Sequence, residues 1–374
     1  MAVVAVASCG KSRLFAFYPS DAAPGDHPIV VPVDASIDLA GSDVVGTEAS
    51  ADASPDPDVP SDIVCPLSTL IGYATLGGTA AAPATTGGKG GATITVDNVT
   101  DLMLYAAMPQ PIVIRISRLI AAQAPVPVMS DKTIEGVGFG DGLVGGGLDL
   151  QGSHNIIIRN LSIGLVIKPN DAIHLDMSKN IWIDHCDLYS NLTDPKGTYD
   201  GLVDIAHASD FVTVSWNKFH DHYLTSLVGN MASSAGTDTG HLTVTYHHNL
   251  FHSAQSYDPR VRSGSVHVFN NLYEGNTDYD QGPAIVSTVN AQVLVEGNIF
   301  SNIKVPISTR ATSEDLMMDG TVWETTAFPN VYNNGSGLND ITMTKPWPTL
   351  PYVYSPDPPG DAENLVRHCA GQIP

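Results

Sequence analysis

Three aspartates are spaced so that their carboxylates could share one bound cation. Asp200 and Asp204 are four residues apart, an even offset that places both side chains on one side of an extended segment. Asp171 stands at a comparable distance before a strand-like segment one repeat earlier. Three hard oxygen donors suit Ca²⁺, which takes about six to eight oxygen ligands in flexible geometry. Asp also caps turns by accepting from backbone N–H groups, so a purely structural role for Asp171 and Asp204 stays open at this point.

The segments that must position these carboxylates form a repeat. Six octets superimpose without gaps, and their first and third positions are apolar, which is the period of two that is typical of a β-strand. Their starts are 22 to 32 residues apart, and no regular helical pattern fills the intervals. The octets are 156–163, 181–188, 212–219, 244–251, 266–273 and 293–300.

Two columns of like residues run through the octets. The sixth position is Asn217, Asn249, Asn271 and Asn298 in four successive octets, with Cys186 in the octet before. The eighth position is apolar or aromatic, namely Leu188, Phe219, Phe251, Tyr273 and Phe300. One short strand cannot bury its apolar face alone, so stacked turns that align these residues are the economical solution. The sequence therefore predicts an all-β fold, a right-handed single-stranded parallel β-helix with an Asn ladder. A β-sandwich is the rival, but it does not predict columns of one residue type.

Composition narrows the classes of partner. The chain has 374 residues, with 17 Lys and Arg against 39 Asp and Glu, which gives a formal net charge of −22. Sequence-independent binding to nucleic acid or to an anionic membrane rests on basic residues, so neither partner is expected. No run of 18 or more apolar residues occurs, so no membrane-spanning segment is predicted. An acidic ligand would need a metal bridge, and a monomer is expected.

The first 62 residues differ in composition from the rest. Residues 1–20 include Val6-Ala7-Ser8-Cys9, which looks like a bacterial lipobox, although no Lys or Arg precedes Cys9. Residues 21–62 hold ten acidic residues and no Lys or Arg, and they cannot bury enough apolar area to fold. We predict a signal or lipobox remnant over 1–20, a disordered solvated linker over 21–62 and a folded domain over 63–374. The protein is expected to be secreted, and a lipid anchor at Cys9 could then hold it at the cell envelope.

The remaining cysteines differ in their expected state. Cys65 and Cys369 bracket the folded domain, and a bridge between them could fasten the C-terminal tail to the first turn in an oxidising compartment. Cys186 falls in the inward column of the octets, so a buried free thiol is predicted there.

Eight motifs occur in a fixed order along the folded domain. They are Thr85–Gly91, Lys132–Gly138, Trp182–Cys186, Asp200–Ile205, Val212–Asn217, Thr245–Asn249, Pro259–Arg262 and Val266–Asn271. Together they resemble the pectate lyase family over about residues 65–300. The resemblance implies a parallel β-helix, secretion and Ca²⁺-dependent β-elimination of polygalacturonate. It also implies that Asp171, Asp200 and Asp204 are the calcium-binding carboxylates.

Two positions depart from the pattern of that family. The family's base is an Arg two residues before the Pro of an Arg-x-Pro-x-x-Arg motif, and Tyr257 stands there. Leu224 stands where the family has a Lys that contacts a substrate carboxylate, whereas Arg262 matches the second Arg of the motif. Three explanations are open. Tyr257 is itself the base, Arg260 has taken over that role, or the chain binds the sugar without cleaving it.

The sequence thus predicts a secreted, pectate-lyase-like enzyme that uses Ca²⁺ to act on acidic polysaccharide, either polygalacturonate or pectin. The catalytic candidates are Tyr257, Arg260 and Arg262, and the candidates for substrate contact are Arg260, Arg262 and Tyr223. The alternative is a non-catalytic carbohydrate-binding or adhesion β-helix that keeps the calcium groove.

Overall fold

The computed structural model of the chain describes residues 2–9, 12–18, 29–33, 65, 69–77, 85–342, 344–345 and 349–373, with those before residue 34 and Ser234 described by backbone alone. The chain divides into two compact units, Met1–Asp62 and Ile63–Pro374. The first unit contains an antiparallel sheet of β1 (Ala2–Cys9), β2 (Ser12–Tyr18) and β3 (Ile29–Val33). Most of the linker predicted over residues 21–62 lies outside the described residues, although β3 falls within it. The side chain of Cys9, the predicted site of lipid attachment, lies outside them too.

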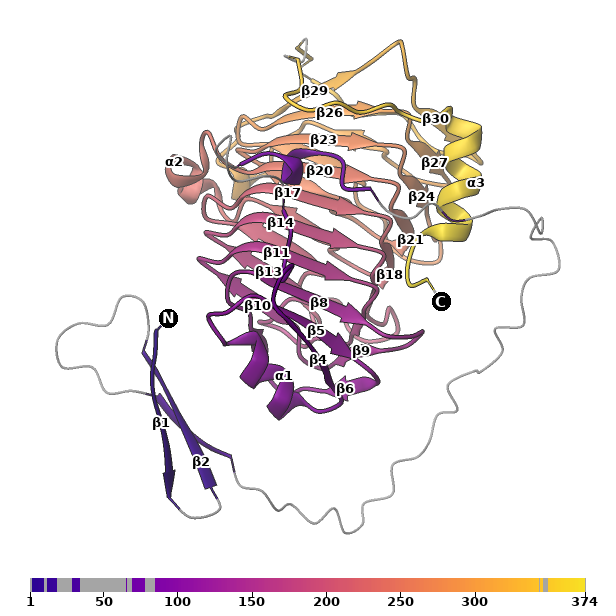
Figure 1. Cartoon of the computed structure of the whole chain (residues 1–374). Coiled ribbons are helices and arrows are strands. Elements are labelled where there is room, and N and C mark those ends of the chain that lie inside the picture. Colours follow the sequence, from indigo (N-terminus) through magenta and orange to yellow (C-terminus); the bar gives the residue numbers. More distant parts are fainter. Residues whose placement is uncertain are drawn as a thin grey trace. The chain divides into compact units, whose positions relative to one another are not determined.

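The second unit is a stack of turns built from three sheets, and all pairings between its named strands are parallel (Figure 1). The eight-stranded sheet consists of β7 (Val126–Pro127), β10 (Leu148–Gln151), β13 (Ile173–Asp176), β16 (Val203–Ala206), β19 (Ser226–Val228), β22 (Arg260–Arg262), β25 (Ile285–Thr288) and β28 (Ile307–Ser308). The ten-stranded sheet consists of β4 (Ala92–Val96), β5 (Ile112–Ile116), β8 (Lys132–Gly136), β11 (His154–Arg159), β14 (Lys179–Asp184), β17 (Asp210–Ser215), β20 (Thr243–His247), β23 (Ser265–Phe269), β26 (Gln292–Glu296) and β29 (Thr321–Glu324). The nine-stranded sheet consists of β6 (Leu119–Ala121), β9 (Gly142–Val144), β12 (Ser162–Gly164), β15 (Asp187–Tyr189), β18 (Lys218–His222), β21 (Leu250–Ala254), β24 (Leu272–Glu274), β27 (Ile299–Ser301) and β30 (Val331–Asn333). The predicted parallel β-helix is confirmed, and the rival sandwich is wrong.

The octets coincide with the register of this stack. Their first positions pair directly from one turn to the next, beginning with Ile156 on Ile181 and ending with Val266 on Val293. Each fifth position has a left-handed backbone, with φ between 51 and 63°. That bend carries the chain from the ten-stranded sheet into the nine-stranded one. The residues at the bend are Asn160, His185, Trp216, His248, Asn270 and Gly297.

The sixth position forms the predicted ladder of side-chain amides. Asn217, Asn249 and Asn271 each donate from Nδ2 to Oδ1 of the next rung, at 3.0, 2.9 and 3.0 Å. Asn298 continues the ladder to Asn330 at 3.1 Å, one rung beyond the octets. The backbone N–H of Cys186 starts it by donating to Asn217 Oδ1 at 2.8 Å, and the Cys186 thiol is buried and free as predicted.

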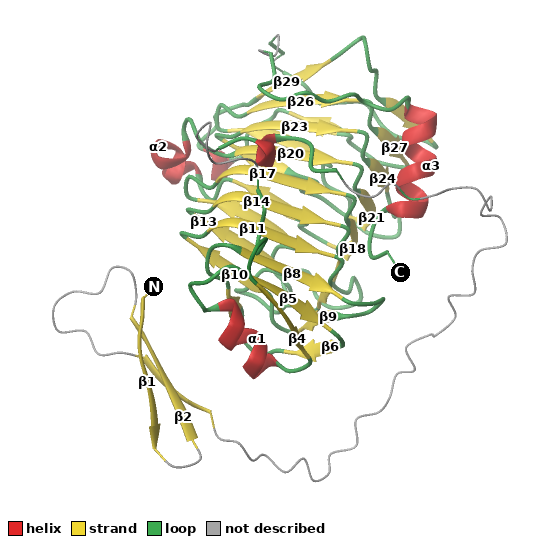
Figure 2. Ribbon diagram, in the orientation of Figure 1, coloured by secondary structure: helices red, strands yellow, loops and turns green. Residues whose placement is uncertain are grey.

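The helices lie outside the stacked sheets (Figure 2). Helix α1 (Val99–Ala106) buries Leu102 and Ala106 beside the first strands, and α2 (Ala235–Asp238) lies in a connecting loop. Helix α3 (Pro359–Cys369) packs Ala362 and Val366 on side chains of the nine-stranded sheet. The described residues also include the short 3₁₀ turns η1 (Tyr73–Thr75), η2 (Ala232–Ser234) and η3 (Ser313–Asp315). Within the part of the chain that the structure describes, no helix is long and apolar enough to cross a membrane.

A disulfide ties the end of α3 to the start of the domain. Cys65 and Cys369 are bonded, with their Cα atoms 5.4 Å apart, and this confirms the predicted pair. It joins residues separated by 304 positions, so it closes nearly the whole domain into one loop.

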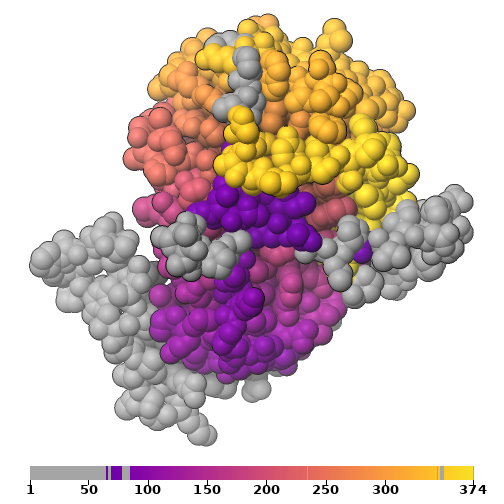
Figure 3. Space-filling model, turned by 45° about the horizontal axis from the view of Figure 1, so that its top comes forward, coloured from indigo at the N-terminus to yellow at the C-terminus, as the bar shows by residue number. Residues whose placement is uncertain are grey.

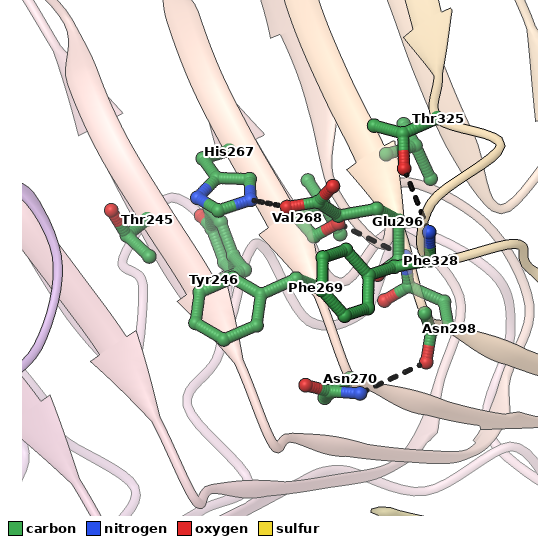
Figure 4. A network of polar contacts seen from close by, with 12 residues as sticks. Thr245, Tyr246, His267, Val268, Phe269, Asn270, Glu296, Asn298, Thr325 and Phe328 are labelled. Atoms are coloured by element: carbon green, nitrogen blue, oxygen red, sulfur yellow. Dashed lines mark hydrogen bonds and ion pairs between the residues drawn. The ribbon is translucent and has the colours of Figure 1, made fainter. Parts of the chain in front are cut away.

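The outer face of the ten-stranded sheet is covered by the chain itself. The C-terminal segment that includes Tyr352 lies against the segment near Tyr73, with the two rings 5.1 Å apart. Figure 3 shows these segments side by side, yellow against violet. Beneath them, His267 bonds to Tyr352 OH through Nδ1 at 2.7 Å and to Glu296 through Nε2 at 3.0 Å, the second contact being visible in Figure 4. This face is therefore occupied, and the predicted site residues lie on strands of the eight-stranded sheet or in the segments just before them.

Candidate functional site

Strand register places the candidate residues in a column across the eight-stranded sheet. His174 pairs with Asp204, Asp204 with Leu227, and Leu227 with Arg260, across strands β13, β16, β19 and β22. Their neighbours along the strands, such as Val203 and Val261, are fully buried in the core. Because side chains alternate along a strand, the column faces outward. Asp204 and Arg260 thus share one face with only β19 between their strands.

The three aspartates meet around Gly201. The Gly201 N–H donates to Asp171 Oδ1 at 2.8 Å, which joins two successive turns. A Cβ added to Gly201 would lie 2.2 Å from Asp204 Oδ1, so glycine lets that carboxylate lie against the backbone. Asp200 immediately precedes this glycine, and its Oδ1 is 3.8 Å from Lys168 Nζ. The structure therefore brings the three predicted carboxylates together.

These carboxylates disfavour one another's charge. Burial, followed by the charge of Asp171, raises the pKa of Asp200. Burial and the charges of Asp171 and Asp200 raise the pKa of Asp204 well above its usual value, against the opposing effects of the Leu227 N–H and Arg262. A cation placed among them would relieve this repulsion.

The carboxylate oxygens also have protein partners. Asp171 Oδ2 is 2.7 Å from His174 Nδ1, and this hydrogen bond raises the pKa of His174. Asp204 Oδ1 accepts from the Leu227 N–H at 3.1 Å. With the side chains so placed, no group of three or more His, Cys, Asp or Glu within the described ranges is arranged to hold a metal ion. The donor chemistry itself, three hard carboxylates, fits Ca²⁺.

An arginine pair lies on β22 and is held by one carboxylate. Asp315 Oδ2 is 2.5 Å from Arg260 Nη2, and Asp315 Oδ1 is 2.7 Å from Arg262 Nε. Burial alone would raise the pKa of Asp315, but the Arg262 hydrogen bond, the Thr312 N–H and the two guanidinium charges hold it at about 2. Arg262 Nη1 also donates to the carbonyl of Asn230 at 2.7 Å. The pair is therefore fixed before any ligand arrives.

Tyr257 belongs to the same group of side chains. Its hydroxyl contacts Arg260 Nη1, and the Arg260 guanidinium lies over its ring, 4.8 Å from the centroid. Its backbone is left-handed, with φ of 66°, and its carbonyl accepts from the Ser226 N–H at 2.7 Å. The side chain that contacts the phenol is therefore Arg260 rather than Arg262.

Tyr223 and Leu224 lie just before β19. The Tyr223 hydroxyl donates to the carbonyl of Leu192 at 2.9 Å, and Lys196 Nζ is 5.9 Å from the Tyr223 ring centroid. Tyr223 therefore anchors the preceding loop, while Leu224 is 38% exposed and presents an apolar surface.

Comparisons with known proteins identify the family. A model of the pectate lyase family matches residues 71–362. This chain belongs to the pectate lyase family. Probable pectate lyase B of Aspergillus flavus is 42% identical over 233 residues, which are 62% of this chain and 68% of that protein. The pectate trisaccharide-lyase of Bacillus licheniformis is 34% identical over 316 residues, 81% of this chain and 86% of that protein.

A solved structure of the same family shares the fold. It is a pectate lyase from a Bacillus species in complex with trigalacturonate, 29% identical, with a TM-score of 0.65. The match covers 81% of this chain and 99% of that one. The family that the motifs predicted is thereby confirmed.

Sequence reasoning missed two members of the site. Asp315 orients both arginines, but it lies beyond the last octet in a turn with no repeat signal. His174 forms a hydrogen bond with Asp171 and pairs with Asp204 on the next strand. This register with Asp204 is the signal from which His174 could have been predicted.

Proposed function

We propose that this pectate lyase family member cleaves polygalacturonate by β-elimination that depends on Ca²⁺. The proposal rests on two groups of side chains that share one face of the sheet. The carboxylates are those of Asp171, Asp200 and Asp204, and the arginine pair lies two strands away. A calcium ion bound by these carboxylates would polarise a uronate carboxylate and thereby acidify its C5 proton. The net charge of −22 supports this need for a cation, because protein and substrate are both anionic.

The arginine pair supplies positive charge where the reaction develops negative charge. In β-elimination a base removes the C5 proton, the C4–O bond breaks, a C4=C5 double bond forms and the leaving oxygen takes a proton from water. Arg260 and Arg262 are held in place by Asp315, so they cost little reorganisation when they meet a substrate carboxylate. Tyr223, at the neighbouring strand, is proposed as a further contact to the sugar.

Tyr257 is the residue that we propose as base. To act as base, Tyr257 first gives its own proton to solvent, and the resulting phenolate then accepts the C5 proton. The Arg260 guanidinium beside the phenol oxygen complements the charge of that phenolate. Tyr257→Phe removes only that oxygen, so we expect kcat on polygalacturonate to fall by about 100-fold or more, the usual contribution of a general base. Binding of trigalacturonate should be kept. Tyr105→Phe is the matched control, because α1 lies beside β7, five strands from β22.

The assay is the ultraviolet absorbance of the unsaturated product formed from polygalacturonate, with calcium and then with a chelator. Absorbance that rises only with calcium supports the lyase. Retention on immobilised pectate that depends on calcium, without absorbance, would instead favour the non-catalytic binding protein. Leu224 and Tyr257, which stand in place of two cations of the family, favour that alternative.

We further propose that the protein acts outside the cell. The Cys65–Cys369 disulfide supports this location, because such bonds persist in oxidising compartments.

A further inference from the structure

The turn that carries Asp315 holds the arginine pair rigidly. Asp315 is fully buried, and its carboxylate also accepts from the backbone N–H of Thr312 at 3.0 Å. Thr312 and Asp315 form a reciprocal capping box around η3, and Thr312 Oγ1 accepts from Arg260 Nη2 at 3.2 Å. The turn and the two guanidinium groups are therefore one connected unit.

Within that unit, one nitrogen of each guanidinium lies near the same oxygen of Glu314. Arg262 uses Nε and Nη1 on Asp315 and Asn230, so its Nη2 points elsewhere. Arg262 Nη2 is 3.6 Å from Glu314 Oε2, and Arg260 Nη1 is 3.8 Å from that same oxygen. Both distances exceed the range of a hydrogen bond. The Glu314 side chain is 72% exposed, so it is a loose partner that water also reaches.

We propose that Glu314 occupies the place of an incoming uronate carboxylate and is a specificity-determining residue of the groove. The inference rests on the proposed function and adds to it a preference at this position. A free carboxylate of the substrate must displace Glu314 and meets its negative charge on approach. A methyl-esterified uronate carries no charge and meets no such repulsion. Glu314 thus lowers the affinity for a fully de-esterified segment and leaves the affinity for an esterified one unaffected.

The test compares Glu314→Gln with the wild-type protein on two substrates. The variant keeps the size of the side chain and removes its charge. We expect it to bind trigalacturonate about fivefold more tightly by calorimetry, and to show a KM for polygalacturonate lower by a similar factor, as befits one loose ion pair. KM for highly methyl-esterified pectin should not change. Glu363→Gln is the matched control. Glu363 pairs with Arg367 at 2.9 Å on α3, which packs on the nine-stranded sheet rather than on the sheet of the arginine pair.

The outcomes separate this inference from the proposed function. A wild-type protein that binds and cleaves polygalacturonate, with a Glu314→Gln variant of equal affinity, would refute the inference alone. Equal shifts on both substrates would refute it as well, because a general change of the turn does not distinguish acid from ester. A wild-type protein that neither binds nor cleaves would refute the proposed function, and the inference with it.

Discussion

Replacing Asp204 with Asn should stabilise the metal-free protein and weaken its stabilisation by calcium. In the metal-free protein, burial and the charges of Asp171 and Asp200 raise the pKa of Asp204. The folded state then binds this proton more tightly than the unfolded chain, so stability falls as the pH rises toward the raised pKa. Asn removes the charge and keeps an oxygen for the Leu227 N–H. The metal-free variant should therefore melt at a higher temperature than the wild type, more so at pH 7 than at pH 4.

Calcium should stabilise the variant less than it stabilises the wild type. At a concentration of about 100 times its Kd, a ligand that binds only the folded state adds about 2.7 kcal/mol. For a domain of this size, about 1 kcal/mol shifts Tm by about 2 °C, so calcium should raise the wild-type Tm by about 5 °C. Loss of even an outer-shell partner of a metal ion weakens affinity by about tenfold or more, and loss of a carboxylate ligand should weaken it at least as much. The calcium shift of the variant should then fall below about 3 °C.

The measurement is thermal unfolding followed by circular dichroism, in chelator and in calcium, at both pH values. Asp97→Asn is the control, because Asp97 is exposed at the end of β4 and away from this sheet. A variant that melts lower than wild type in chelator, or that keeps the full calcium shift, would refute the placement of Asp204 among repelling carboxylates that bind the ion.

Three other substitutions test the fold, each by denaturant unfolding. Asn249→Ala breaks four buried hydrogen bonds of the ladder and should cost about 4 kcal/mol, whereas Asn364→Ala, exposed on α3, should cost almost nothing. Cys369→Ser should cost about 2–4 kcal/mol, and reductant should lower the wild type to the same value and leave the variant unchanged. Asp258 is fully buried, and burial raises its pKa to about 7, against a hydrogen bond from Thr225. The free energy of unfolding of the wild type therefore falls between about pH 4 and pH 7, because the buried carboxyl must ionise. Asp258→Asn has no such charge, so its free energy of unfolding should exceed that of the wild type by about 4 kcal/mol at pH 8 and by nothing near pH 4. A gain that does not depend on pH would contradict this interpretation.

The strands of this fold are predictable because two periodicities coincide. Alternation along each strand and the recurrence of octets together fix which residues stack, down to the pairing of Ile156 with Ile181. The bend at the fifth position of each octet is harder to predict from the sequence. Asn160, Asn270 and Gly297 favour a left-handed backbone, but His185, Trp216 and His248 adopt it as well. At those positions the stacked neighbours impose the bend, which local sequence preference does not reveal.

The site divides in the same way. Asp171, Asp200 and Asp204 stand 10, 12 and 8 residues before the start of an octet. Stacking of the octets therefore predicts that the three side chains come close together. Asp315 contacts the arginines from a turn that follows the last octet, and its place depends on how that turn packs. No periodicity in the sequence carries this information.

The balance of charge on the sheet face supports the proposal of a cation site at the aspartates rather than at the arginines. Arg260 and Arg262 bear two positive charges, and Asp315 with Glu314 returns two negative ones within 4 Å. That end is therefore neutral until a ligand displaces Glu314. Among the described residues, the basic groups beside Asp171, Asp200 and Asp204 are His174, 2.7 Å from Asp171, the exposed Lys168, 3.8 Å from Asp200, and Arg262, which acts on Asp204. The deficit of positive charge therefore falls on the three aspartates, and a divalent ion with oxygen preference would correct it.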